Sequence, residues 1–242
     1  MTDGRKKILE AIRRATGVSS NGSAKRNAGA TTRTAAEAHP ENPRGYVRRG
    51  EMTVGARLDR FIERLREYDA EVVECAPEGL AATITAVLAA SGRHKFVAPP
   101  EIPAEWYVEA AWKIQGLECT FDHGLETREI ERAEGVITAC FCGVADSGTI
   151  VLHHSTSEGR RVLSLLPDWH LCIVRASQVV ETLPEYFDKC REQGAGNREQ
   201  EAGSLPKLVT WISGPSATAD IEMTRIKGVH GPRFLNVILV RD

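Results

Sequence analysis

The amino-acid sequence predicts an α/β fold in which a largely parallel sheet is covered by helices. Short apolar runs of strand character alternate with stretches of helical periodicity along most of the chain. This alternation is typical of parallel sheets, because each pair of parallel strands needs a crossover connection that is usually a helix. The composition, with 42% hydrophobic and 26% charged residues in 242, is that of a globular domain. No internal repeat indicates a solenoid.

The folded part is expected to begin near Met52. Val54, Leu58, Phe61 and Leu65 fall at helical spacing, and the same spacing returns after Pro77. The expected helices cover residues 54–65, 80–88, 103–113, 126–132 and 183–192. The expected strands cover residues 71–75, 95–98, 117–121, 135–140, 148–152, 170–174, 207–213 and 234–240. Residues 193–206 are polar and rich in glycine, which favours an exposed loop of the same domain.

Residues 1–50 differ in composition from the rest of the chain. Ile8, Leu9 and Ile12 form an apolar stripe too narrow for a helix that is stable alone, and no Leu, Ile, Phe or Met occurs in residues 16–50. We therefore expect an N-terminal helix and a flexible arm over residues 1–50, and one α/β domain over residues 51–242. The arm is locally basic, which is typical of a solvated segment and, as the alternative, of a nucleic-acid contact.

Charge and cysteine content narrow the function classes. Lys and Arg (31) nearly balance Asp and Glu (33), so no general attraction to nucleic acid or an anionic membrane is expected. Neither a long apolar run nor a signal-peptide core is present, which favours a cytoplasmic protein. Six cysteines are too few for a disulfide scaffold and are expected to be reduced thiols.

The segment that follows the strand at 207–213 is the first candidate site. Ligands of open parallel sheets bind at the carboxyl ends of the strands. Here a Gly-Pro turn is expected to lead into a helix whose first turn carries hydroxyls and a carboxylate, and a helix start of this kind suits a phosphate or carboxylate ligand. The alternative is that the same side chains cap the helix. The residues concerned are Ser213, Gly214, Ser216, Thr218 and Asp220.

His230 lies on a second candidate loop, between Gly228 and the Gly231-Pro232 turn. The two glycines permit tight turns and the proline fixes the direction of the chain. A histidine held there can act as an acid, a base, an anion partner or a metal ligand, and the alternative is a hydrogen bond to the turn backbone.

A third candidate combines a polar turn and an arginine pair. Asp146, Gly148 and Thr149 precede an apolar strand, and Arg160 and Arg161 follow it as a possible clamp for a carboxylate. Ordinary turn chemistry and surface arginines are the alternative.

No metal site is expected. Cys140 and Cys142 lie near His153 and His154, but Cys-x-Cys is not the spacing of a structural zinc site. The motifs G-x-S-x-G and G-x-G-x-x-G and the P-loop are absent, which removes the main support for a serine hydrolase, a Rossmann dehydrogenase or an NTPase. The sequence indicates no particular cofactor.

Two long stretches resemble the lactate utilization protein C family, whose members carry the LUD domain. They read ADSGTIVL…EGRRVLSLLPDWHLCIVRASQVVETLPE and TWISGPSATADIEMTRIKGVHGPRFLNVILV. The resemblance implies a three-layer, Rossmann-like α/β sheet similar to the sugar-phosphate isomerase and CoA-transferase superfamily. It also implies a role in oxidising L-lactate to pyruvate beside two iron–sulfur partner proteins.

The resemblance maps family motifs onto positions of this chain, and three hypotheses stay open. The acidic-x-Gly-Thr turn, the Gly-Arg-Arg segment and the C-terminal blocks match Asp146, Gly148, Thr149, Arg160, Arg161, Ser213, Gly214, Pro215, Ser216, Thr218, Asp220, Glu222, His230 and Gly231. The first hypothesis is a lactate-oxidation component that binds a small carboxylate, with Asp220, Glu222 and His230 as acid and base candidates. The second is a non-catalytic subunit that docks the iron–sulfur partners through residues 1–50. The third is a CoA-transferase-like enzyme with Glu222 as nucleophile, by analogy of fold.

Overall fold

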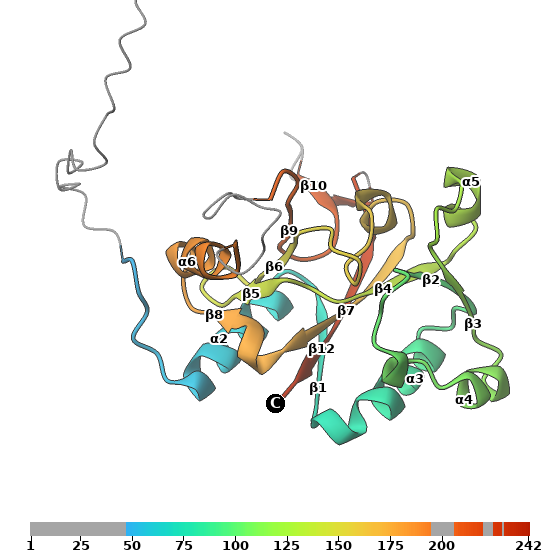
Figure 1. The fold of residues 1–242 in the computed structure, drawn as a ribbon, viewed down its shortest axis with the longest axis horizontal. Helices are drawn as coiled ribbons and strands as arrows, with labels where there is room; N and C mark the ends of the chain where they lie inside the picture. The colour runs from blue at the N-terminus through green and yellow to red at the C-terminus, as the bar shows by residue number, and fades with distance from the viewer. Residues whose placement is uncertain (1–46, 195–205, 220–224, 229) are drawn as a thin grey trace, which may run out of the picture. The chain divides into compact units, whose positions relative to one another are not determined.

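A six-stranded parallel sheet forms the centre of the domain (Figure 1). A computed structural model describes residues 47–194, 206–219, 225–228 and 230–242 of the chain. The strands, in their order across the sheet, are β1 (Glu71–Cys75), β12 (Phe234–Val240), β7 (Trp169–Arg175), β4 (Gly135–Thr138), β2 (Lys95–Ala98) and β3 (Glu118–Phe121). Every neighbouring pair is parallel, which confirms the predicted α/β class.

Helices cover one face of this sheet. They are α3 (Leu80–Ala90), the short 3-10 turn η2 (Ala104–Trp106) and α4 (Glu109–Ile114). Leu80, Ile84 and Leu88 recur every four residues of α3, so they share one side of the helix and are buried in the core over the sheet. The indole N–H of Trp112 donates to Thr85 Oγ1 at 3.1 Å and joins α4 to α3. Helix α5 (Thr127–Ile130) follows β3.

A second, four-stranded sheet and helix α2 (Val54–Glu67) cover the other face. Its strands, in order, are β8 (Val179–Val180), β5 (Cys142–Val144), β6 (Thr149–Leu152) and β9 (Thr210–Ile212). Ile150 and Leu152 pack with Phe61 and Leu65 of α2 over the central sheet. Helix α6 (Leu183–Gly194) buries Tyr186 against this second sheet. The sequence did not predict β5, β8 or this mixed sheet.

A short antiparallel ribbon replaces the helix that was expected after the Gly214-Pro215 turn. In it, β10 (Ala217–Ala219) pairs with β11 (Arg225–Lys227). The N–H of Ser216 donates to the carbonyl of Pro232 at 2.8 Å, and the carbonyl of Ser216 accepts from the N–H of Gly228 at 2.9 Å. The backbone groups that would start a helix are therefore bonded across the chain, and the prediction of an anion site at a helix start here is wrong.

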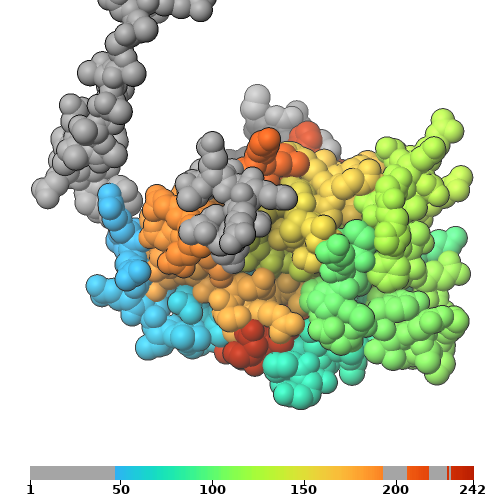
Figure 2. Space-filling view, viewed as in Figure 1, coloured from blue at the N-terminus to red at the C-terminus, as the bar shows by residue number. Residues whose placement is uncertain are grey.

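The chain enters the domain slightly before the predicted boundary at Gly50. The N–H groups of Gly50 and Met52 donate to the carboxylates of Glu185 and Glu181 at 2.9 and 2.7 Å. Figure 2 shows this blue segment lying against the orange surface of α6. The predicted N-terminal helix, most of the predicted arm and most of the loop at 193–206 lie outside the described residues. No helix in the described part of the chain has the length and apolar character needed to cross a membrane.

Candidate functional site

A cavity of about 270 Å³ gathers several of the residues that the sequence singled out. It lies between β9 and the amino ends of β7 and β12, where His170 and Leu235 lie side by side in the central sheet. The predicted site residues on its wall are Ser213, Gly214, Ser216, His230 and Gly231. The sequence places the candidate site after the carboxyl end of a strand, and the loop of Ser213 to Ser216 does follow β9, although the cavity borders the amino ends of β7 and β12 in the central sheet.

Ser216 holds the two loops of this cavity together. Its Oγ accepts a hydrogen bond from the backbone N–H of His230 at 3.0 Å. Because a hydroxyl both donates and accepts, the Ser216 O–H remains able to donate to a ligand. Gly214 has a φ of 96°, and a Cβ there would lie 2.8 Å from the carbonyl oxygen of Tyr68, so only glycine fits this approach without strain.

His170 contributes a neutral ring to the cavity. Its Nε2 lies 2.8 Å from Thr138 Oγ1, and the side chain is buried between neighbouring strands. Burial lowers the pKa of His170 to about 4, because the charged imidazolium would lose its hydration. The contact with Thr138 and the burial of the ring fit a structural role for His170.

The Asp146 turn lies apart from His230 but is joined to the cavity through hydroxyls. Ser147 Oγ lies 2.7 Å from Thr149 Oγ1, which lies 2.7 Å from Ser213 Oγ. Gly148 has a φ of 59°, and a Cβ there would lie 2.6 Å from the Cβ of Arg64, so this glycine lets the turn pack on α2. Ser213 also lines a second cavity, of about 450 Å³, which the Asp146 turn borders.

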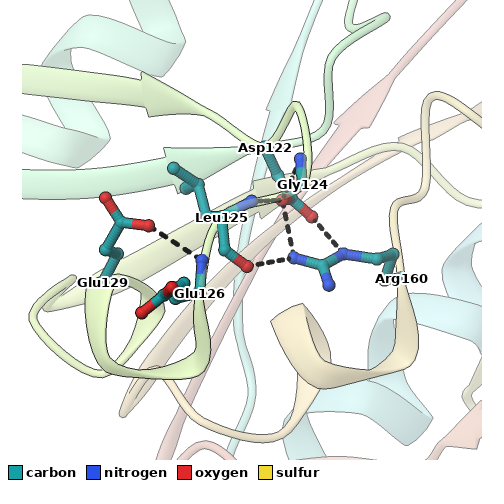
Figure 3. A network of polar contacts seen from close by, with 6 residues as sticks. All are labelled: Asp122, Gly124, Leu125, Glu126, Glu129 and Arg160. Atoms are coloured by element: carbon teal, nitrogen blue, oxygen red, sulfur yellow. Dashed lines mark hydrogen bonds and ion pairs between the residues drawn. The ribbon is translucent and has the colours of Figure 1, made fainter.

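Arg160 is engaged in an ion pair (Figure 3). Its Nε and Nη2 donate to the two carboxylate oxygens of Asp122 at 2.8 and 2.7 Å, and Nη2 also donates to the carbonyl of Leu125 at 2.9 Å. The Asp122 side chain is 1% exposed, and the guanidinium holds its pKa below the ordinary value. The sequence did not single out Asp122. Arg160 thus fixes the loop after β6 to the end of β3, and neither it nor Arg161 is among the described residues that line the smaller cavity.

The loop after β6 is held by a buried carboxylate. Glu158 accepts hydrogen bonds from the backbone N–H groups of His153 and His154 and from Ser155 Oγ, and burial raises its pKa. His154 has a φ of 58°, and its ring reaches from the carbonyl of Gly159 to Thr210 Oγ1, at 2.9 and 2.8 Å. These contacts give the histidines a structural role. Among the described residues, no three His, Cys, Asp or Glu side chains are grouped as a metal site.

The other predicted site residues do not line the smaller cavity or lie outside the described residues. Arg161 is exposed at the start of the 3-10 turn η3 (Arg161–Ser164), and Thr218 lies in β10. Asp220 and Glu222 lie outside the described residues. Asp122 and Thr210 act through contacts with distant segments, a signal that local spacing does not carry, whereas Glu158 acts within its own loop.

Comparisons with known proteins agree with the resemblance seen in the sequence. The LUD domain model matches residues 58–240. Lactate utilization protein C of Deinococcus radiodurans is 36% identical over 184 residues, which cover 76% of this chain and 79% of the relative. Lactate utilization protein C of Macrococcus caseolyticus is 30% identical over 217 residues, which cover 84% of this chain and 88% of the relative.

A solved structure shares the fold. The crystal structure of a DUF162 family protein from Deinococcus radiodurans superposes with a TM-score of 0.62 at 30% identity, and the match covers 78% of this chain and 99% of that one. Family model, relatives and fold agree over the same part of the sequence. The chain therefore belongs to the LUD domain family.

Proposed function

We propose that this chain is a component of a cytoplasmic L-lactate oxidation system and binds a small carboxylate in the 270 Å³ cavity. The names of its relatives support lactate as the substrate of the system. The observation that carries the site is the convergence of Ser213, Ser216 and His230 on one cavity. Its volume lies at the lower end of ligand sites, which favours a ligand of a few heavy atoms over a dinucleotide.

Ser216 and His230 are the proposed contacts with the ligand. The Ser216 O–H is available to donate to a carboxylate oxygen, and its position is fixed by the N–H of His230. The exposed imidazole of His230 supplies a second donor or a base. Asp220 and Glu222 share the proposed acid and base role.

The reaction removes two protons and two electrons from the 2-hydroxy acid to give the 2-oxo acid. We assign the hydroxyl proton and the proton from the Cα–H bond to two different bases among His230, Asp220 and Glu222, and the two electrons to iron–sulfur partner proteins, which accept them one at a time. Arg160 stays a structural residue in this scheme, because Asp122 already takes its guanidinium.

Growth on L-lactate tests the proposal. A strain that lacks this gene is complemented with the wild type or with Ser216→Ala, His230→Ala, Asp220→Asn or Glu222→Gln, and protein levels are matched by immunoblot. Ser216→Ala and His230→Ala are expected to slow growth on lactate and leave growth on glucose unchanged. Arg161→Ala, outside the cavity, is the matched control. Full rescue by all four variants at normal protein level would contradict the proposal.

Calorimetry on the purified chain tests ligand binding directly. L-lactate and pyruvate are titrated into the wild type and into Ser216→Ala, with acetamide as a neutral control. The loss of one hydrogen bond to a charged ligand is expected to weaken binding about tenfold. Equal affinity of wild type and variant would remove Ser216 from the site.

A role in assembly is the second candidate. The N–H groups of Gly50 and Met52 donate to Glu185 of α6 and to Glu181 just before it, so the chain is anchored to the domain at these two residues. Deletion of residues 1–46 is then expected to abolish co-purification with the iron–sulfur partners while the domain stays folded. Unchanged co-purification would contradict this candidate. A CoA-transferase-like reaction at Glu222 stays a prediction, tested by trapping an acyl adduct on that residue.

A further inference from the structure

We propose that the second cavity, of about 450 Å³, binds a planar aromatic ligand whose polar end is neutral or positively charged and donates a hydrogen bond. The cavity lies between the Asp146 turn and the start of α6. It is a site distinct from the proposed carboxylate site and does not depend on it, although Ser213 lines both cavities.

The walls of this cavity are apolar and partly open to solvent. Trp211 of β9 and Leu183 at the start of α6 are 43% and 47% exposed, and Phe187 lies one turn further along the helix. The rings of Tyr186 and Trp211 pack edge to face with their centroids 4.7 Å apart, which fixes the orientation of the indole. A flat ring gains most from such a surface, because it buries a large apolar area and stacks on a fixed aromatic side chain.

The polar end of the cavity offers acceptors and one negative charge. Asp146 is exposed and is the one ionisable side chain among the described residues that line the cavity. No hydrogen bond or ion pair from another described residue is found on its carboxylate. A carboxylate can only accept, so the matching ligand group must donate. An anionic group would instead meet an unpaired like charge.

Three hydroxyls line this polar end of the cavity. Ser147, Thr149 and Ser213 form a chain with both oxygen–oxygen separations at 2.7 Å. Each hydroxyl can donate or accept, so the chain adapts to the ligand group without favouring an anion.

The start of α6 does not reverse this preference. A helix start attracts anions, but here Glu185 places a carboxylate in the first turn of α6, where it accepts from the N–H groups of Glu181 and Thr182 at 2.7 and 3.1 Å. The positive end of the helix is therefore already balanced by a carboxylate of the chain. The charge left without a described partner at the cavity is that of Asp146, which selects a neutral or cationic ligand.

Three probes that share a naphthalene ring and differ in their polar group test the charge preference of the cavity separately from its affinity for the ring. The full chain is titrated by calorimetry with 2-naphthylmethylamine, 2-naphthol and 2-naphthoate, which end in a cation, a neutral donor and an anion. The amine and the naphthol are expected to bind, and the amine is expected to bind most tightly. The naphthoate is expected to bind at least about tenfold more weakly than the amine.

Two variants and a control assign the preference to this cavity. Asp146→Asn, at an exposed position, is expected to remove the advantage of the amine and to strengthen naphthoate binding. Trp211→Ala is expected to weaken all three probes by a similar factor. Asp59→Asn, an exposed acid on α2 outside the cavity, is expected to change nothing.

Several results would overturn the proposal. They are equal affinity for the three probes, no binding of the amine and the naphthol, or an unchanged order of affinities in Asp146→Asn. Circular dichroism of each variant checks that the domain is folded, and Asp146→Asn alone decides the charge preference if Trp211→Ala does not fold.

Discussion

Replacement of Arg160 by methionine tests whether the Asp122–Arg160 ion pair stabilises the fold. The variant loses three hydrogen bonds, two to the carboxylate and one to the carbonyl of Leu125, and leaves a buried charge. Asp122 keeps the hydrogen bonds that it accepts from the N–H groups of Gly124 and Leu125, at 3.1 and 2.9 Å, and the Arg160 side chain is half exposed. These two facts reduce the cost below that of a fully buried pair, to about 2 kcal/mol.

The assay is urea unfolding at two pH values. At pH 7 a loss of about 2 kcal/mol corresponds to a roughly 30-fold larger unfolding constant and a melting temperature about 4–8 °C lower. The folded pKa of Asp122 lies below its unfolded value of about 3.9, so the contribution of the pair is present above that value and disappears as the pH falls through the folded pKa. The difference between wild type and variant is therefore expected to narrow below about pH 4.

Arg161→Met supplies the matched control, because this neighbour is exposed and no described residue pairs with it. It is expected to change stability by less than about 0.5 kcal/mol. A loss below about 0.5 kcal/mol in Arg160→Met, or a loss that is the same at pH 7 and in acid, would refute the reasoning.

Three further predictions concern other parts of the domain. Gly148→Ala is expected to lower the urea midpoint by an amount equivalent to about 1–3 kcal/mol, because its φ is 59° and a Cβ would meet the backbone of Arg64 at 2.8 Å. Gly55→Ala in α2, where nothing lies within 4 Å, should not destabilise. Burial lowers the pKa of His170 to about 4, below its unfolded value of about 6.5, so the contribution of His170 to stability should fall by about 2 kcal/mol from pH 7 to pH 5, and His170→Gln should reduce the pH dependence of stability by that amount. Trp211 is 43% exposed and the other three tryptophans at most 3%, so Trp211→Phe should remove most of the acrylamide-quenchable fluorescence; unchanged quenching would contradict the burial described.

The elements with a strong local pattern were predictable. Strands at 71–75, 95–98 and 234–240 agree with the structure at both ends, and α2 and α3 begin where their periodicity begins. The two helices bury one apolar side, and β12 is buried along most of its length, so the local sequence carries the information. The family resemblance was also confirmed, over residues 58–240.

The second sheet and the ribbon could not be predicted from local sequence patterns. β5 has three residues and β8 has two, and the pairing that joins them links segments far apart in the sequence. At Ser216 the tertiary bonds to Gly228 and Pro232 overrode a local sequence that resembles a helix start. The Glu158 loop is fixed through His154 and Thr210, 56 positions apart, which no local window compares.

The carboxylate of Glu185 connects two events that would otherwise be independent. One oxygen accepts from the N–H of Gly50, and the other accepts from the N–H groups of Glu181 and Thr182 in the turn that leads into α6. Detachment of the entering segment and fraying of that turn therefore share one local opening free energy, and the amide protons of Gly50 and Thr182 should exchange with solvent at linked rates. Val47 and Leu183 both border the 450 Å³ cavity, so we expect this local opening to change the wall of that cavity as well.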